Sequence, residues 1–158
     1  MNYRIQVTGI EIVSKSMTQP PKNGVGPVFT FALHAETRVH VKRERLIEFV
    51  KMEVKGRPGG EEEPEGELEL ATLSMSCLFS VEDFQKVIVK NEEGLYVIPP
   101  GIEATIRPIT ISTARGVLYS EFRGTYLNNA VLPIVDMHNT NQLPTSKVPV
   151  PKRRKAKK

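Results

Sequence analysis

The sequence predicts an α+β fold, in which one antiparallel sheet of four long strands precedes a helical C-terminal part. Residues 29–41 alternate between apolar and polar side chains, which is the period of a half-buried strand. The strand-like segments are joined by turns or loops, and no helix-sized connection separates them as parallel strands would require. After Ser80 the apolar spacing changes to three and four residues, which indicates helix. With 158 residues, of which 39% are hydrophobic, the chain can bury one core, so we expect one folded domain.

The clearest predicted strand is residues 29–41. Its odd positions carry the apolar residues Phe29, Phe31, Leu33, Ala35, Val39 and Val41. The other predicted strands are residues 4–13, 46–56 and 67–81, and in each the apolar positions change phase once. Because a slip of one residue turns the following side chains to the opposite face, each slip marks either a bulge or a strand that is apolar on both faces.

Two helical segments are predicted after the fourth strand. Residues 80–88 form a short helical turn, with Ser80 as its N-cap and Asp83 three residues later. Residues 99–122 form a longer amphipathic helix, although their β-branched content would also suit a strand. Its apolar stripe consists of Ile102, Ile106, Ile109, Thr113, Val117 and Phe122.

Two residues interrupt the longer helix. Pro108 lacks a backbone N–H and its ring clashes with the preceding turn, so we expect a kink or a fresh helix start there. Gly116 is about 1 kcal/mol less favourable than alanine in a helix interior. We expect the close approach of another backbone to offset that loss.

The charge of the chain is unevenly distributed. The net charge is +4, but the final seven residues, "KRRKAKK", hold six of the 22 basic residues and no acidic one. Residues 1–151 therefore carry 16 basic and 18 acidic residues, a net charge of −2. Residues 139–158 contain several prolines and few apolar residues, so we expect a disordered basic tail after a domain that spans residues 1–138.

The sequence lacks the residue patterns of a catalytic or metal site. His34 and His40 share one strand about 20 Å apart at roughly 3.3 Å per residue, and His138 stands outside any ligand spacing. Cys77 is the single cysteine and lies in an apolar run, so we expect a buried thiol. The glutamates of residues 61–67 lie in a loop rich in glycine and proline, so we expect a solvated hairpin tip rather than a metal or partner site. We expect no enzymatic activity, no cofactor and no bound metal.

The chain shows no apolar run of membrane-spanning length and no signal-peptide pattern at residues 1–13. We therefore expect a cytoplasmic protein without a membrane span.

Several motifs of this sequence, in this order, resemble the SecB-like export chaperones and their relatives attached to toxin–antitoxin systems. The motifs are "CLFSVEDF" (77–84), "RPITISTARGVL" (107–118) and "GTYLNNAVLPIVD" (124–136), within a match over residues 3–137. Residues 28–41 also fit the crossover loop and second strand of that family. The resemblance implies a four-stranded antiparallel sheet with two helices on one face, assembled as a dimer of dimers. It also implies ATP-independent binding of unfolded polypeptides.

The resemblance assigns roles to particular residues. A client groove would have Phe29 and Leu33 on one wall and Tyr126, Leu127, Leu132 and Ile134 on the other. Arg115 and Gly116 would serve helix packing within or between protomers. Partner docking on the outer face of the sheet would use Glu11 and Leu70, but Lys15 and Thr72 stand where that family is acidic. Docking of the translocase ATPase is therefore in question, and an antitoxin is an alternative partner.

Two other functions remain open from the sequence. The basic tail could give an accessory protein affinity for RNA or another acidic surface, in which case binding should fall steeply with salt. Alternatively, the chain could be a structural or assembly protein that kept the fold without chaperone activity.

Overall fold

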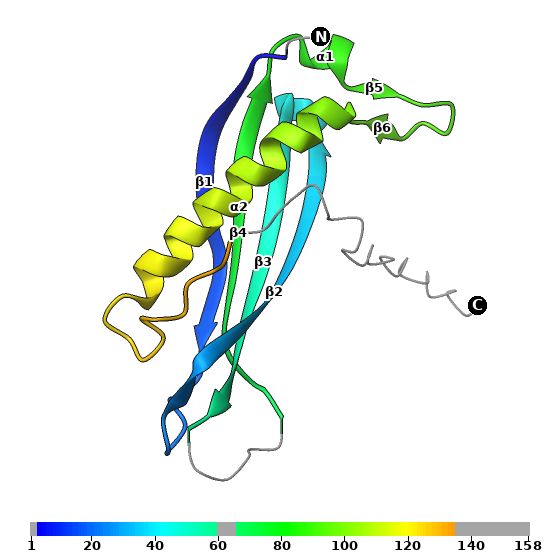
Figure 1. Cartoon of the computed structure of the whole chain (residues 1–158). Coiled ribbons are helices and arrows are strands. Elements are labelled where there is room, and N and C mark those ends of the chain that lie inside the picture. The colour runs from blue at the N-terminus through cyan, green and yellow to red at the C-terminus, as the bar shows by residue number, and fades with distance from the viewer. Residues whose placement is uncertain (1–2, 60–65, 135–158) are drawn as a thin grey trace, which may run out of the picture.

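The structure, a computed structural model of the chain, describes residues 3–59 and 66–134. Four long strands form one sheet, and a two-stranded hairpin precedes the long helix (Figure 1). The elements are β1 (Ile5–Met17), β2 (Val25–His40), the 3-10 helix η1 (Val41–Arg43), β3 (Arg45–Pro58), β4 (Leu68–Val81), α1 (Phe84–Val87), β5 (Val89–Lys90), β6 (Tyr96–Val97) and α2 (Pro100–Phe122). The predicted basic tail lies outside the described residues.

The large sheet has the strand order β1-β4-β3-β2, and every neighbouring pair is antiparallel. Helix α2 crosses one face of this sheet diagonally and contacts β3 and β4, whereas α1 is a single turn beyond the end of β4 (Figure 1). The predicted α+β fold with a four-stranded antiparallel sheet and two helices is confirmed. The order also makes β1 and β2 the two edge strands of this sheet.

The three predicted phase changes have two different structural causes. The pairing of β1 with β4 shifts register between Val7 and Gly9 and again between Ile12 and Ser14, and the β3–β4 pairing shifts beside Leu70. The phase changes of β1 and β4 therefore coincide with β-bulges or similar irregularities in their pairing. In β3, by contrast, the register with β4 is unbroken from Arg45 to Val54, so β3 is a regular strand that is apolar on both faces.

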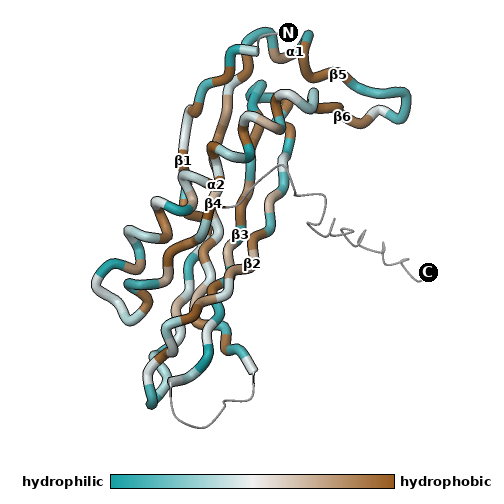
Figure 2. The backbone as a smooth tube through the Cα atoms, in the orientation of Figure 1, coloured by the Kyte–Doolittle hydropathy of each residue, from teal (hydrophilic) through white to brown (hydrophobic). Residues whose placement is uncertain are grey.

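The core lies between the sheet and α2, and the apolar backbone segments of Figure 2 follow it along β3 and β4. The buried residues of α2 recur mainly at every fourth position: Ile102, Ile106, Thr110, Ile111, Ala114, Leu118 and Phe122. The predicted stripe was right at Ile102, Ile106 and Phe122 and wrong at Ile109, which is 38% exposed. Thr113 is half-buried, and Val117 is partly buried and packs against the core. A four-residue step exceeds the helical repeat of 3.6, so the contact row winds around the helix as it crosses a twisted sheet.

Helix α2 does not restart at Pro108, as the sequence had allowed, but runs as one element from Pro100 to Phe122. It starts with Pro100 in the first turn, where a missing N–H is harmless. After Phe122 the chain turns at Gly124, whose φ of 77° suits glycine.

The short helical turn also starts later than predicted. Strand β4 continues through Ser80 to Val81, and the residue that precedes α1 is Asp83 rather than Ser80. Asp83 takes a left-handed conformation (φ 53°) and its side chain makes no capping hydrogen bond. The β5–β6 hairpin was not predicted, because its strands have two residues each and leave almost no periodic signal.

Candidate functional site

One apolar surface lies on the α2-facing side of the edge strand β2. We call it the β2 strip and define it as Phe29, Phe31, Leu33, Ala35 and Val39. All five side chains pack against the core but are only partly buried. Because α2 packs on β3 and β4, the helix leaves part of this strip accessible to another molecule.

The opposite side of β2 has a different chemistry. Arg38 donates from Nε to Glu36 at 2.8 Å, and this hydrogen bond holds the pKa of Glu36 below its ordinary value. The Arg38 guanidinium also lies 4.6 Å from the ring centre of Phe49. Strand β2 is therefore mainly apolar toward the helix, with the exception of Thr37, whose hydroxyl donates to the buried Glu48 carboxylate. Its outer face is charged.

The second predicted wall of the groove is the segment that follows α2. We call residues 123–134 the exit segment. Its first part is fixed by Tyr126, whose hydroxyl donates to the carbonyl oxygen of Thr18 at 2.9 Å, beside the end of β1. Its last part is fixed by Arg115 of α2, which donates to the carbonyl oxygens of Leu132 and Pro133, both at 3.0 Å. The exit segment is thus attached to the body at both ends.

The four groove residues predicted on the exit segment have unequal exposure. Leu127 and Leu132 lie in the core, with 0% and 3% exposure, so neither side chain is open to a client in this structure. Tyr126 is half-buried, and Ile134 is 87% exposed. Of the second predicted wall, only Tyr126 and Ile134 present accessible side-chain area.

The structure separates the predicted docking residues. Glu11 is exposed and pairs with Ser76, on the face away from α2. Leu70 is 1% exposed, so its side chain belongs to the core and offers no docking surface. Lys15 points toward α2, where it forms an ion pair with Glu121, and not toward the outer face. Thr72 hydrogen-bonds to Ser16 across the strand pair at 2.6 Å.

The packing role expected for Gly116 is wrong within the protomer. A Cβ placed there would meet no heavy atom within 4 Å, and the residue is exposed on the outer side of α2. Arg115 does pack within the chain, through its two bonds to the exit segment. Any close contact at Gly116 would have to come from another molecule.

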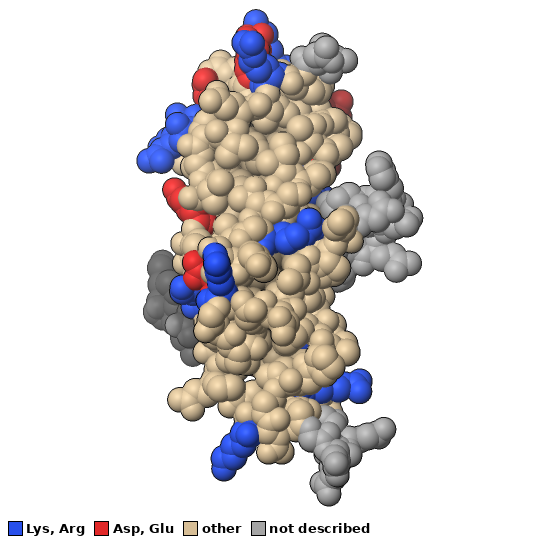
Figure 3. Space-filling view, turned by 60° about the vertical axis from the view of Figure 1, so that its left-hand side comes forward, with Lys and Arg blue, Asp and Glu red and all other residues tan. Residues whose placement is uncertain are grey.

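A second apolar surface runs along the edge strand β1. Val7, Ile10, Ile12, Val13 and Met17 are between 39% and 57% exposed. Figure 3 turns the β1 side of the molecule forward and shows a face on which uncharged side chains dominate. The outer side of α2 adds small or uncharged exposed residues to the available surface, including Ser112, Gly116 and Tyr119.

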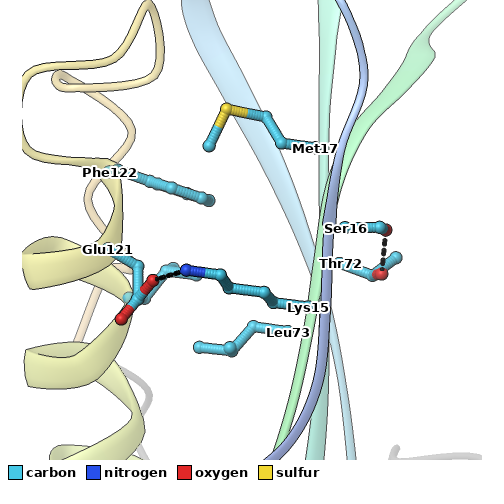
Figure 4. Close-up of a pocket in the computed structure, with 8 residues that line it drawn as sticks. Lys15, Ser16, Met17, Thr72, Leu73, Glu121 and Phe122 are labelled. Carbon is cyan, nitrogen blue, oxygen red and sulfur yellow. Dashed lines mark hydrogen bonds and ion pairs between the residues drawn. The ribbon is translucent and has the colours of Figure 1, made fainter.

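A pocket of about 150 Å³ opens between the last residues of β1 and the last turn of α2 (Figure 4). Met17, Leu73, Leu118 and Phe122 supply its apolar walls, and the Lys15–Glu121 ion pair spans it. Sequence reasoning missed this site, because its residues come from three segments that are far apart in the chain.

The structure shows where the histidines and the cysteine considered from sequence lie. Nδ1 of His40 accepts a hydrogen bond from the backbone N–H of Arg43 at 3.3 Å, and His34 lies exposed on β2, whereas His138 lies outside the described residues. Cys77 is buried, and burial raises the pKa of its thiol. Within residues 3–59 and 66–134, no group of three or more His, Cys, Asp or Glu could hold a metal ion. Among the same residues, no helix is long and apolar enough to cross a membrane.

Comparisons with known proteins support the fold and leave the family open. No family model matches the sequence. The search of curated proteins also finds no match. A solved structure of similar fold is a SecB-like chaperone of Mycobacterium tuberculosis, in complex with a ChAD peptide from the HigA1 antitoxin. It aligns with a TM-score of 0.53 and 14% sequence identity, over 84% of this chain and 91% of the chaperone chain. The chain therefore shares the fold of a SecB-like chaperone.

Proposed function

We propose that this chain is an ATP-independent holdase, which binds extended segments of unfolded polypeptides and prevents their aggregation. The observation that carries the proposal is the β2 strip, a row of partly exposed apolar side chains on an edge strand. The neighbour of similar fold holds a peptide, which is consistent with this role. The proposed activity needs no catalytic group, and its clients include nascent chains and antitoxin segments.

The chemistry of β2 suits an extended client. An edge strand presents backbone N–H and C=O groups without a strand partner, and an added strand can bond to them. The register of β2 with β3 is continuous from Phe29 to His40, so this edge is a regular template over that length. Apolar client side chains would cover the β2 strip, at about 25 cal/mol for each Å² removed from water. Hydrogen bonds to the client backbone do not depend on the client side chains, so this edge suits many client sequences, as a holdase requires.

The test of this proposal uses two substitutions on neighbouring positions of one strand. Leu33→Ser makes the β2 strip more polar, and His34→Ser is the matched control on the outer face. Light scattering of a reduced, aggregating client measures suppression, and circular dichroism checks the fold. We expect Leu33→Ser to weaken suppression at least severalfold and His34→Ser to leave it unchanged. Equal suppression by both folded variants would place the client elsewhere.

We also propose that the holdase is a homo-oligomer, up to a dimer of dimers. The support is the exposed apolar row of β1 on the second edge of the sheet, together with the uncovered Gly116 on α2. Static light scattering of wild type and Ile10→Lys tests this assembly. We expect two or four protomers for wild type and a lower mass for the variant. A monomeric wild type at micromolar concentration would refute it.

The partner that delivers clients is a separate question for experiment. Of the two predicted docking residues, Glu11 is accessible and Leu70 is buried in the core. We propose that any docking of a translocase ATPase uses the outer face around Glu11. Glu11→Lys should then abolish co-elution with that ATPase while suppression of aggregation is retained.

A further inference from the structure

The β5–β6 hairpin is an ordered but fully exposed arm. Every residue from 89 to 97 is exposed. The backbone N–H of Asn91 donates to the carbonyl oxygen of Leu95, and the N–H of Leu95 donates to Oδ1 of Asn91, both at 2.9 Å. Gly94 closes the turn with a φ of 77°. Figure 1 shows the arm projecting beyond the sheet at the end where β2 passes into β3.

The two faces of the hairpin differ in chemistry. Val89 lies opposite Val97, and Leu95 is two residues before Val97, so strand alternation places these three side chains on one face. They are 51%, 44% and 61% exposed, in the order Val89, Val97 and Leu95. On the other face Lys90 pairs with Tyr96, and its Nζ lies 5.1 Å from the ring centre. The first face is therefore apolar and open to solvent.

An exposed hairpin of this kind gains from a partner. A two-stranded hairpin is at best marginally stable in water unless it packs against another element. Covering its apolar face would contribute about 25 cal/mol for each Å² removed from water. In Figure 2 the two strands of the arm are apolar and the turn between them is hydrophilic. A matching surface should therefore be apolar beside the strands and polar beside the turn.

The β2–β3 turn, at the same end of the sheet, has the matching chemistry. Val41 in this turn is 41% exposed, and Lys42 and Arg43 beside it are exposed. The tip of the hairpin carries the exposed Glu92 and Glu93. Among the described residues, none of these four charged side chains is in an ion pair. Two carboxylates and two cations are thus available for contacts with another molecule.

The neighbouring charges leave this contrast intact. Glu44, which ends the turn, accepts a hydrogen bond from Nε2 of Gln85 in α1. Arg45, at the start of β3, adds a further positive charge. Lys90 lies over Tyr96, on the face of the hairpin away from its apolar residues. The turn is therefore basic and the hairpin tip is acidic.

We propose that the hairpin arm of one protomer docks on the β2–β3 turn of a second copy of the chain, and that the second copy returns the same contact. The apolar face of the arm covers Val41, while Glu92 and Glu93 meet Lys42 and Arg43. Because each copy supplies both surfaces, a twofold axis closes the contact. The inference rests on the proposed homo-oligomer, to which it adds an interface separate from the β1 row. It is independent of the holdase activity.

The test measures the mass of the full chain by sedimentation velocity over a series of protein concentrations. All variants carry Ile10→Lys, which disrupts the β1 assembly, and Ile10→Lys alone should remain a dimer. The tip variant adds Glu92→Lys and Glu93→Lys, and the turn variant adds Lys42→Glu and Arg43→Glu. In each, like charges meet across the contact, so we expect the dimer to weaken at least about tenfold.

A mixture of the two variants is the decisive measurement. In an equimolar mixture, the reversed tip of one variant faces the reversed turn of the other, and the unchanged tip faces the unchanged turn. Both contacts are then between opposite charges, so the mixture should recover the dimer that neither variant forms alone. A contact within one chain would not produce this recovery. Circular dichroism checks that each variant is folded.

Two controls separate the contact from general effects. Glu11→Lys with Glu69→Lys changes the net charge by the same amount at exposed positions of β1 and β4, and should keep the dimer. Leu95→Ser removes an apolar side chain from the proposed contact and should weaken the dimer severalfold. Lys90→Gln, on the opposite face of the same hairpin, should leave it unchanged.

Three results would overturn the hairpin contact. The first is an oligomeric wild type whose Ile10→Lys variant is monomeric at every concentration. The second is a mixture of folded tip and turn variants that stays monomeric, which would leave the arm to a different protein. The third is equal dissociation in the Glu11 and Glu69 control. A monomeric wild type would instead refute the homo-oligomer as a whole, and loss of aggregation suppression would concern the holdase function alone.

Discussion

Arg115, in the C-terminal half of α2, donates from Nε to the carbonyl oxygen of Leu132 at 3.0 Å and from Nη2 to that of Pro133 at 3.0 Å. These two bonds keep the end of the exit segment against the helix. A single guanidinium thus satisfies two successive backbone acceptors with donors held in a rigid planar fork, whereas a lysine ammonium is a single compact centre whose donors are not held in that geometry. The relationship links the "STARG" motif to the "LPIVD" motif across 17 residues.

We expect Arg115→Met to lower the free energy of unfolding by about 2 kcal/mol, because hydrogen bonds from charged groups contribute about 1.5–3 kcal/mol. Arg115→Lys should lie between wild type and Arg115→Met. Urea denaturation measures the change, with Arg123→Met as the control at an exposed position just after α2. A loss equal to that of the control would mean that the exit segment is held by its apolar residues alone.

The second prediction concerns Glu48, a fully buried carboxylate on β3 that accepts a bond from Nε of Arg107 at 3.1 Å. Removal of one partner of a buried pair costs about 3–5 kcal/mol, because the other charge stays buried. We expect Arg107→Met to approach the lower value, since Arg107 keeps 29% of its side chain exposed. The double variant Glu48→Met with Arg107→Met should recover part of the loss in a double-mutant cycle. Additive losses would contradict a coupled pair.

The third prediction separates the two possible roles of Gly116. Within the protomer a side chain at this position meets no neighbour, so Gly116→Ala should raise the stability of the chain by up to about 1 kcal/mol through helix propensity. Gly116→Leu should leave the fold intact but lower the oligomer mass in light scattering, if another protomer packs there. An unchanged mass would exclude this face of α2 from the assembly. Ser112→Leu is a comparison one turn earlier on the same exposed side.

The fourth prediction uses alkylation of Cys77 to report how easily α2 separates from β4. Burial raises the pKa of its thiol, so the native protein should resist alkylation at pH 8, whereas the urea-unfolded chain should react within minutes. A folded-state pKa above the unfolded value of about 8.5 contributes stability below that pH, and this contribution is lost as pH rises through the folded pKa. Mass spectrometry of the alkylated protein counts the modification. Rapid native labelling would show that α2 lifts easily from β4.

The strands and their amphipathic character could be predicted from sequence, because alternation is a local property. The pattern of residues 29–41 correctly identified the apolar face of β2, which faces α2. The slip around Gly9 left a bulge and a two-faced strand as alternatives, and the structure has a register shift there. The middle of α2 was mispredicted at Ile109, because the contact row depends on how the helix crosses a twisted sheet. That crossing is set by the strands, which lie elsewhere in the chain.

The sequence by itself determined the fold class, since residue spacing decides whether a segment can bury one face as a strand or as a helix. It could not decide which apolar residues of the exit segment are core and which are surface. Leu127 and Ile134 both read as apolar loop residues, yet one is fully buried and the other is 87% exposed. Only the tertiary structure brought Lys15 to Glu121 and created the pocket between them. The physical reason is that burial and pairing depend on segments more than 100 residues apart, which meet only after the sheet and the helix have packed.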